Sequence, residues 1–80
     1  MAQHRVLLFA GLAESCGCAE VLLEVPSRCT IAAIRMAAAQ QLPALEEATY
    51  RVSMNSRYVE ETDTVPDGAE IAFLPPVSGG

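Results

Sequence analysis

The chain has 80 residues, which suits one domain with a small core, and hydrophobic residues make up 51% of it. Five Lys and Arg against ten Asp and Glu give a formal net charge of −5, which argues against binding to nucleic-acid phosphates or anionic lipid. The charge favours a basic protein surface as partner, and it equally suits a small protein that only needs to stay soluble.

Targeting and cysteine patterns point to the cytoplasm. No apolar run approaches the roughly 20 residues that span a bilayer, and the N-terminus lacks the layout of a signal peptide. The cysteines, Cys16, Cys18 and Cys29, are odd in number, which argues against a disulfide framework. A C-x-C pair and one histidine are too few ligands for structural zinc, so we expect no metal.

The first part of the chain predicts two strands. Residues 5–10 form an apolar run of strand length, and 11–17 contain two glycines and read as a loop. Residues 20–25 form a second strand, closed by Pro26, which cannot donate a ladder hydrogen bond. Two such runs around a loop predict an antiparallel pair.

A helix is predicted over residues 31–42. Thr30 can cap it by accepting a backbone N–H, the composition is rich in alanine, and Pro43 stops it. Its apolar positions recur every three or four residues and define one stripe: Ile31, Ile34, Ala38 and Leu42.

Three more strands are predicted, at 50–54, 57–59 and 70–74. Asn55-Ser56 reads as the turn between the first two, and Pro66-Asp67-Gly68 is a strong turn signal before the last. One helix cannot cover both faces of a parallel sheet, so the order predicts an α+β domain with a mixed sheet and the helix on one face. The helix follows a hairpin and leads to a strand that can lie beside the first.

The segment with chemical meaning follows the last strand, and it divides the chain into a folded domain at 1–74 and an extended tail at 75–80. Pro75 and Pro76 stiffen the tail and Gly79 has no side chain, so the carboxylate of Gly80 can enter a narrow site. ATP can convert this carboxylate to an acyl-adenylate, and a sulfur nucleophile can then leave a thiocarboxylate. The sequence has no phosphate loop, so partners would supply the catalytic groups. An inert, frayed terminus is the alternative.

Several segments carry a family resemblance: Phe9-Ala10 with Leu12 and Glu14, then 52–55 with Tyr58-Val59, then 67–71, and above all 73–80. Together they resemble the small subunit of molybdopterin synthase, the MoaD-like branch of the ubiquitin-like sulfur carriers.

This resemblance implies a ubiquitin-like β-grasp fold and a thiocarboxylate on Gly80, with Gly79 as the thin neck behind it. It implies three protein partners: an adenylyltransferase that uses ATP, a sulfur donor, and the large synthase subunit, in a heterotetramer. There the sulfur would be used to build molybdopterin from cyclic pyranopterin monophosphate. The chain itself would bind no cofactor. Residues expected at the partner surface are Phe73, Leu74, Pro75, Pro76, Val77 and Ser78.

The remaining candidates are expected to be structural. Phe9 is predicted in the core, with the apolar patch beside the tail entrance as the alternative, and Tyr50 and Tyr58 are also predicted in the core. His4 is predicted at the surface. Cys29 is predicted as a buried thiol, with mild activation by the helix N-terminus as the alternative. Acidic residues around one turn suggest a solvated face or a docking patch for a basic activating enzyme: Glu60, Glu61, Asp63 and Asp67.

Three other functions stay open. A thiamin-type carrier that supplies sulfur for thiazole is one, although its tail usually lacks the Phe-x-Pro-Pro lead-in. A protein modifier that joins Gly80 to a target lysine is another. An interaction module with an inert tail is the third.

Overall fold

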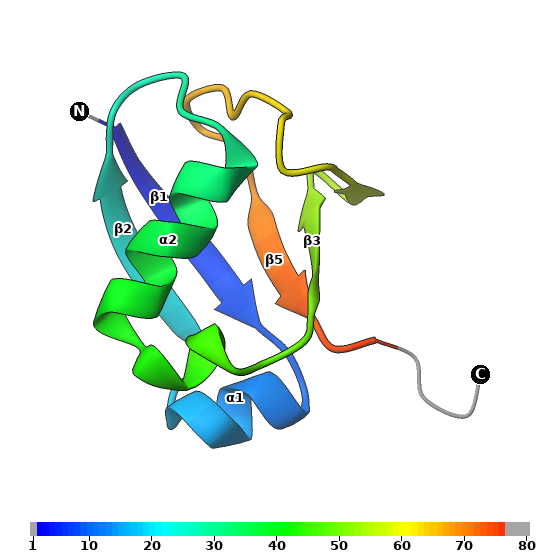
Figure 1. Cartoon of the computed structure of the whole chain (residues 1–80). Coiled ribbons are helices and arrows are strands. Elements are labelled where there is room, and N and C mark those ends of the chain that lie inside the picture. The colour runs from blue at the N-terminus through cyan, green and yellow to red at the C-terminus, as the bar shows by residue number, and fades with distance from the viewer. Residues whose placement is uncertain (1, 77–80) are drawn as a thin grey trace.

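The structure is a computed structural model that describes residues 2–76; Met1 and residues 77–80 lie outside the described part. Figure 1 shows the elements, which follow in the order β1 (Ala2–Leu8), α1 (Gly11–Cys16), β2 (Glu20–Val25), α2 (Ile31–Gln41), the 3-10 turn η1 (Pro43–Glu46), β3 (Arg51–Met54), β4 (Arg57–Tyr58) and β5 (Ile71–Leu74).

The strands form one mixed sheet in the order β2-β1-β5-β3-β4. The two central strands, β1 and β5, are parallel, and the other pairings are antiparallel. Helix α2 crosses one face of the sheet, while the opposite face, here called the outer face, is not covered by any described helix (Figure 1). This is a β-grasp arrangement, so the predicted fold class is confirmed. The division into a domain at 1–74 and a tail at 75–80 stays a prediction.

The antiparallel pairing of the first two strands is confirmed, but the predicted neighbour of the first strand is wrong. The strand that lies beside β1 is β5, and β3, which follows the helix, pairs with β5 instead. The reason is burial on both faces. Ile71, Ala72 and Phe73 are at most 9% exposed, and such a continuous apolar run is typical of a central strand.

Helix α2 agrees with its sequence signals. Thr30 has an extended backbone and its hydroxyl accepts the N–H of Ala33 at 3.3 Å, as an N-cap does. The predicted stripe faces the sheet, since Ile31, Ile34 and Ala38 are buried. Pro43 ends the α-helix as expected and opens the 3-10 turn η1.

The segment predicted as a loop at 11–17 contains the short helix α1, so that prediction is wrong. Leu12 is only 5% exposed and holds the helix against the core. Gly17 ends it in the left-handed region with φ of 76°, and its N–H donates to the Ala13 carbonyl at 2.9 Å. A glycine at this position is a common helix stop, so the sequence contained the signal.

Both predicted turns are present. Asn55 and Ser56 have φ of 52° and 69°, the pattern of a type I′ turn between β3 and β4. Gly68 has φ of 81° before β5, and the Ala69 N–H donates to the Pro66 carbonyl at 3.2 Å.

Three predictions about the core have different outcomes. Tyr50 is buried, as expected, but Tyr58 is 56% exposed, so its predicted core position is wrong. His4 is not at the surface: it is 2% exposed, because it shares the inward face of β1 with Val6 and Leu8.

No helix among residues 2–76 is long and apolar enough to cross a membrane.

Candidate functional site: the sheet end that carries the tail

The candidate site lies where β5 ends at Leu74. Pro75 is half-buried and Pro76 is exposed, and the chain has left the sheet by this point. Two prolines in succession cannot donate ladder hydrogen bonds, which explains why the strand stops here. The predicted site residues Val77, Ser78, Gly79 and Gly80 lie outside the described residues.

The root of the tail is held on both sides by neighbouring strands. Leu8 of β1 is the register partner of Phe73, and Arg51 of β3 is the partner of Leu74. The Phe9 N–H donates to the Phe73 carbonyl at 3.3 Å and extends the ladder beyond β1. A tail that leaves a central, doubly paired strand starts from a fixed position, which lowers the entropic cost of presenting it.

The predicted surface position of Phe73 is wrong, and so is the predicted core position of Phe9. Phe73 is 0% exposed and its ring stacks on Tyr50, with centroids 4.5 Å apart. Phe9 is 45% exposed. The backbones of Phe9 and Phe73 are joined by a hydrogen bond, but their side chains differ in exposure. Phe73 lies on the face of the sheet that helix α2 covers, and Phe9 does not. Phe9, with the half-buried Leu74 and Pro75, is therefore the apolar surface at this end.

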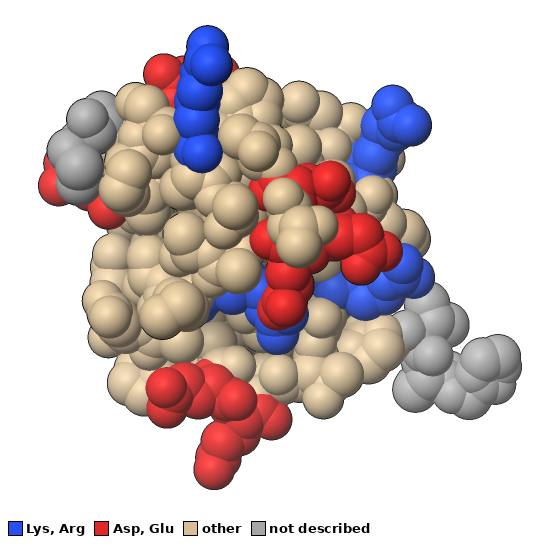
Figure 2. Space-filling model, turned by 45° about the horizontal axis from the view of Figure 1, so that its top comes forward, with Lys and Arg blue, Asp and Glu red and all other residues tan. Residues whose placement is uncertain are grey.

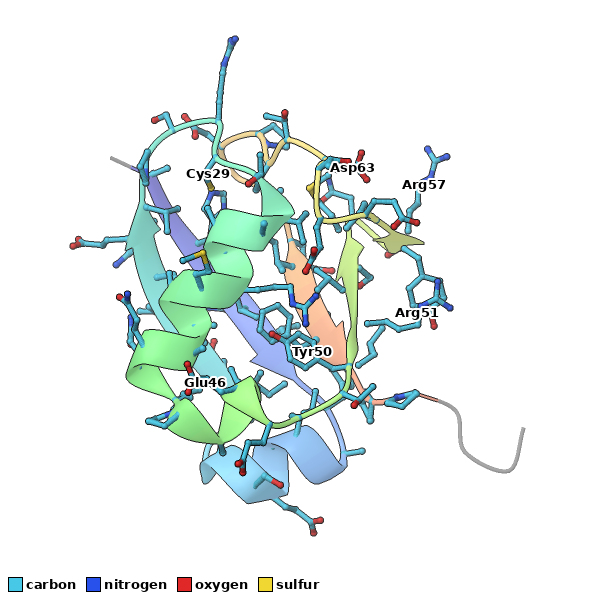
Figure 3. The ribbon with its side chains drawn as sticks, viewed as in Figure 1. Cys29, Glu46, Tyr50, Arg51, Arg57 and Asp63 are labelled. Atoms are coloured by element: carbon cyan, nitrogen blue, oxygen red, sulfur yellow. The ribbon has the colours of Figure 1, made fainter. Side chains whose placement is uncertain are left out.

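Sequence reasoning missed an aromatic and basic pair beside the tail root. The guanidinium carbon of Arg51 lies 3.8 Å from the centroid of the Tyr58 ring. Next to them is a hollow of about 260 Å³ lined by Ser53, Ser56, Tyr58 and Leu74. In Figure 3, Arg51 lies near the end of β5, and Arg57 lies farther up the hairpin, near Asp63. The sequence did contain a signal for the position of Arg51. Side chains alternate between the two faces of a strand, so a buried Val52 places the neighbouring Arg51 on the outer face.

A larger hollow, about 470 Å³, lies on the helix side of the molecule, away from the tail root, and its lining includes Met36, Leu45 and Tyr50. Arg35 closes one side: its Nε donates to the Tyr50 hydroxyl at 3.3 Å and it pairs with Glu61. These contacts raise the pKa of Arg35 above its usual value, first through the Tyr50 hydrogen bond and then through Glu61. Because two nitrogens of the guanidinium are engaged in these contacts, we assign this hollow to the packing of the fold.

The acidic residues of the predicted docking patch partly serve the fold. Glu61 is engaged by Arg35, and the Asp63 carboxylate accepts the Glu60 N–H at 2.7 Å. Figure 2 shows carboxylates gathered in the middle of this face of the molecule, with arginine side chains around them. Docking of a basic enzyme at these residues stays a prediction.

Among residues 2–76 no three His, Cys, Asp or Glu side chains are grouped to hold a metal ion.

Sulfur carriers and protein modifiers are both among the proteins that resemble this chain. A curated relative, the molybdopterin synthase sulfur carrier subunit of Arabidopsis thaliana, is 33% identical over 78 residues, covering 95% of this chain and 81% of the relative. SAMP1, the small archaeal modifier protein 1 of Haloferax volcanii, has a structure with a TM-score of 0.88 at 29% identity, over 99% of this chain and 100% of that one.

A third similar structure is the complex of subunits 1 and 2 of the molybdopterin-converting factor from Helicobacter pylori. The match has a TM-score of 0.70 at 20% identity, over 98% of this chain and 99% of that chain, and supports the fold. The model of the ThiS family matches residues 6–80, which include both the anchored strand β5 and the Gly-Gly tail. The chain therefore belongs to the ThiS family.

Proposed function

We propose that this chain is a sulfur carrier of the molybdopterin synthase type, in which Gly80 is the residue that carries sulfur. The observation that carries the proposal is that the family match continues through the tail to residue 80, directly after a strand fixed in the centre of the sheet. The 33% identity to a molybdopterin synthase sulfur carrier subunit favours this branch of the family.

The proposed chemistry takes place on the terminal carboxylate. An adenylyltransferase joins the carboxylate of Gly80 to the α-phosphate of ATP, and pyrophosphate leaves. Hydrosulfide supplied by a donor protein then attacks the carbonyl carbon, the bond to AMP breaks with its electron pair leaving on the phosphate oxygen, and the sulfur loses its proton. The product is a thiocarboxylate, whose sulfur attacks a carbon of cyclic pyranopterin monophosphate in the large synthase subunit and displaces an oxygen from it. Water then cleaves the acyl–sulfur bond, which leaves the sulfur on the pterin and returns the carboxylate of Gly80.

The described residues contribute presentation rather than catalysis. The ladder contacts around Phe73 and Leu74 fix where the tail begins, and Pro75 and Pro76 limit its directions. The exposed Phe9 beside the half-buried Leu74 offers an apolar contact for the protein that takes the tail. In the Helicobacter pylori structure, a protein of this fold is in a complex with a second subunit of its factor. We place the reaction in the cytoplasm, where thiols stay reduced.

The decisive experiment is intact-mass spectrometry of the full chain after incubation with ATP, the adenylyltransferase and a sulfur donor from the same genome. The expected result is a mass gain equal to the exchange of one oxygen for one sulfur, mapped to Gly80. A chain that lacks Gly80 is the control and should gain nothing while keeping its fold. If the full chain is never adenylated or thiolated, or if the truncated chain still supports molybdopterin formation, the proposal is wrong.

A second candidate function is protein modification, because SAMP1 is also similar in structure at 29% identity. Both functions begin with the same adenylate, and they differ in the nucleophile that attacks it. A modifier would appear as isopeptide conjugates of high mass between Gly80 and lysine side chains. A pull-down that captures a large synthase subunit favours the first function, and capture of a thiazole synthase would favour a thiamin-type carrier.

A further inference from the structure

Arg51 and Tyr58 form a single unit on the outer face of the sheet, here called the Arg51–Tyr58 platform. They come from the neighbouring strands β3 and β4, and the guanidinium carbon lies 3.8 Å from the ring centroid. Tyr58 is the register partner of Ser53, and Arg51 lies two residues before Ser53 on the same face. Such diagonal neighbours are within reach of a long side chain and an aromatic ring, so the register itself brings them together.

The basic residues of the chain are five arginines, and they differ in how their charges are used. Arg5 pairs with Glu20 at 2.8 Å, and Arg35 pairs with Glu61. Within residues 2–76, Arg28, Arg51 and Arg57 have no carboxylate within 4.0 Å, and of these three Arg51 is the register partner of the last residue of β5. Its stack on Tyr58 uses the face of the guanidinium and leaves the in-plane N–H donors of its fork available.

The position of the platform ties it to the tail. Arg51 is directly opposite Leu74, the last residue of β5, and the hollow beside Tyr58 is lined by Leu74 as well. The carboxylates of β2 lie at the opposite edge of the sheet, since β2 and β4 are its two outer strands. Glu60 and Glu61 line a hollow of about 170 Å³ together with Arg51, but neither is within ion-pair distance of it. Within residues 2–76, Arg51 is therefore a cation without an ion-pair partner next to the root of the tail.

We propose that the Arg51–Tyr58 platform receives a surface carboxylate of the adenylyltransferase that takes the tail. This inference rests on the proposed function and adds to it the chemistry of the docking surface. A guanidinium is planar and binds a carboxylate with two parallel hydrogen bonds, which fixes orientation as well as attraction. Stacking on Tyr58 pre-orders the long side chain, so less conformational entropy is lost on binding. The excess of acidic groups on the chain repels the same partner carboxylate, so the position of Arg51 beside the tail root favours one docking orientation.

The first test needs no enzyme. The full chain, labelled with ¹⁵N and ¹³C, is titrated with hexaglutamate at low salt and followed by NMR at the arginine Nε–H signals and the aromatic ring signals. The Arg51 signal and the Tyr58 ring are expected to shift, whereas the Nε–H of Arg57 is not. Arg57 is the matched control because it is exposed, belongs to the same hairpin and is opposite Met54 on the other face. If Arg51 does not shift, or if Arg57 shifts as much, the inference is wrong whatever the protein does.

The second test measures adenylation kinetics of the full chain with the adenylyltransferase from the same genome. Arg51→Gln is expected to raise KM for this chain by about two- to fivefold with kcat unchanged, the size of one exposed ion pair. Arg57→Gln should leave KM unchanged. Tyr58→Leu should give a smaller rise than Arg51→Gln, and Tyr58→Phe, which keeps the ring, should behave as the wild type. The difference between Arg51→Gln and wild type should vanish near ~1 M salt, where charges are screened within about 3 Å.

The outcomes separate the two proposals. Adenylation of the wild type with equal KM for Arg51→Gln would overturn the docking inference and leave the sulfur-carrier function intact. A wild-type chain that is never adenylated would overturn the proposed function, and the hexaglutamate titration would still decide whether the platform accepts carboxylates.

Discussion

The rings of Tyr50 and Phe73 stack with their centroids 4.5 Å apart and their planes inclined by 24°. Phe73 comes from the central strand β5, and Tyr50 immediately precedes β3. The guanidinium carbon of Arg35 lies 4.8 Å from the Tyr50 centroid, so helix α2 joins the same contact. The last residues before the tail are thus held through the core and not only through the sheet.

Replacing Phe73 should therefore weaken the fold more than replacing the exposed phenylalanine at the same sheet end. Phe73→Leu is expected to lower the free energy of unfolding by about 1–2 kcal/mol, through lost stacking and imperfect filling of the core. Phe9→Leu makes the same chemical change at a 45% exposed side chain and should cost less than about 0.5 kcal/mol. Urea denaturation at constant m-value measures both; equal effects would contradict the assignment of Phe73 to the core.

His4 is expected to be a destabilising residue. It is 2% exposed, and within the described residues neither Nδ1 nor Nε2 has a hydrogen-bond partner. A buried polar group without a partner carries a desolvation cost of roughly 1–3 kcal/mol. His4→Leu should consequently raise the free energy of unfolding by about 1 kcal/mol, while Gln3→Leu on the exposed face should not. A His4→Leu variant less stable than wild type would show that the imidazole is satisfied in solution.

Ala10 holds a backbone conformation that favours glycine. Its φ is 50° and its ψ is −126° at the entrance to α1. A residue with a Cβ is strained there by roughly 1–3 kcal/mol. Ala10→Gly should increase stability by about 1 kcal/mol, whereas Ala13→Gly, inside α1, should lower it by about as much. Thermal unfolding of the two variants tests the pair, and a loss of stability in both would contradict the strain.

Thiol chemistry gives a prediction that depends on pH. Burial raises the pKa of Cys29 above its usual value, and the nearby charge of Asp67 raises it further, while a hydrogen bond from its own backbone N–H lowers it. A raised pKa means that the folded chain holds this proton more tightly than the unfolded chain. The corresponding stability is present below the ordinary thiol pKa and is lost as pH rises through the folded pKa.

Alkylation by iodoacetamide in a Cys16→Ser, Cys18→Ser variant reports on Cys29 alone. Its rate should rise with pH to a midpoint above that of the same chain unfolded in urea, since the thiolate is the reacting form. Asp67→Asn should bring the midpoint partway back. A folded midpoint below the unfolded one would overturn this account of Cys29.

The comparison of sequence and structure is clearest along β1 and β5. Residues 5–10 are apolar without alternation, so the sequence does not say which side chains face inward. Pairing with the neighbouring strands decides this. Val6 and Leu8 face the core, so the alternate residues Leu7 and Phe9 face outward. The same pairing buries Phe73, and the two phenylalanines were therefore predicted on the wrong sides.

By itself the sequence determined the main helix with its Thr30 cap, the turns at Asn55-Ser56 and Gly68, the first strand pair, and the end of the last strand at Leu74. These are local features, set by periodicity, capping and backbone preferences within a few residues. Only the tertiary structure decided that β5 lies between β1 and β3, that His4 is buried, and that Arg51 meets Tyr58 beside the tail root. Strand order and facing depend on contacts between segments far apart in the chain, which no local pattern encodes.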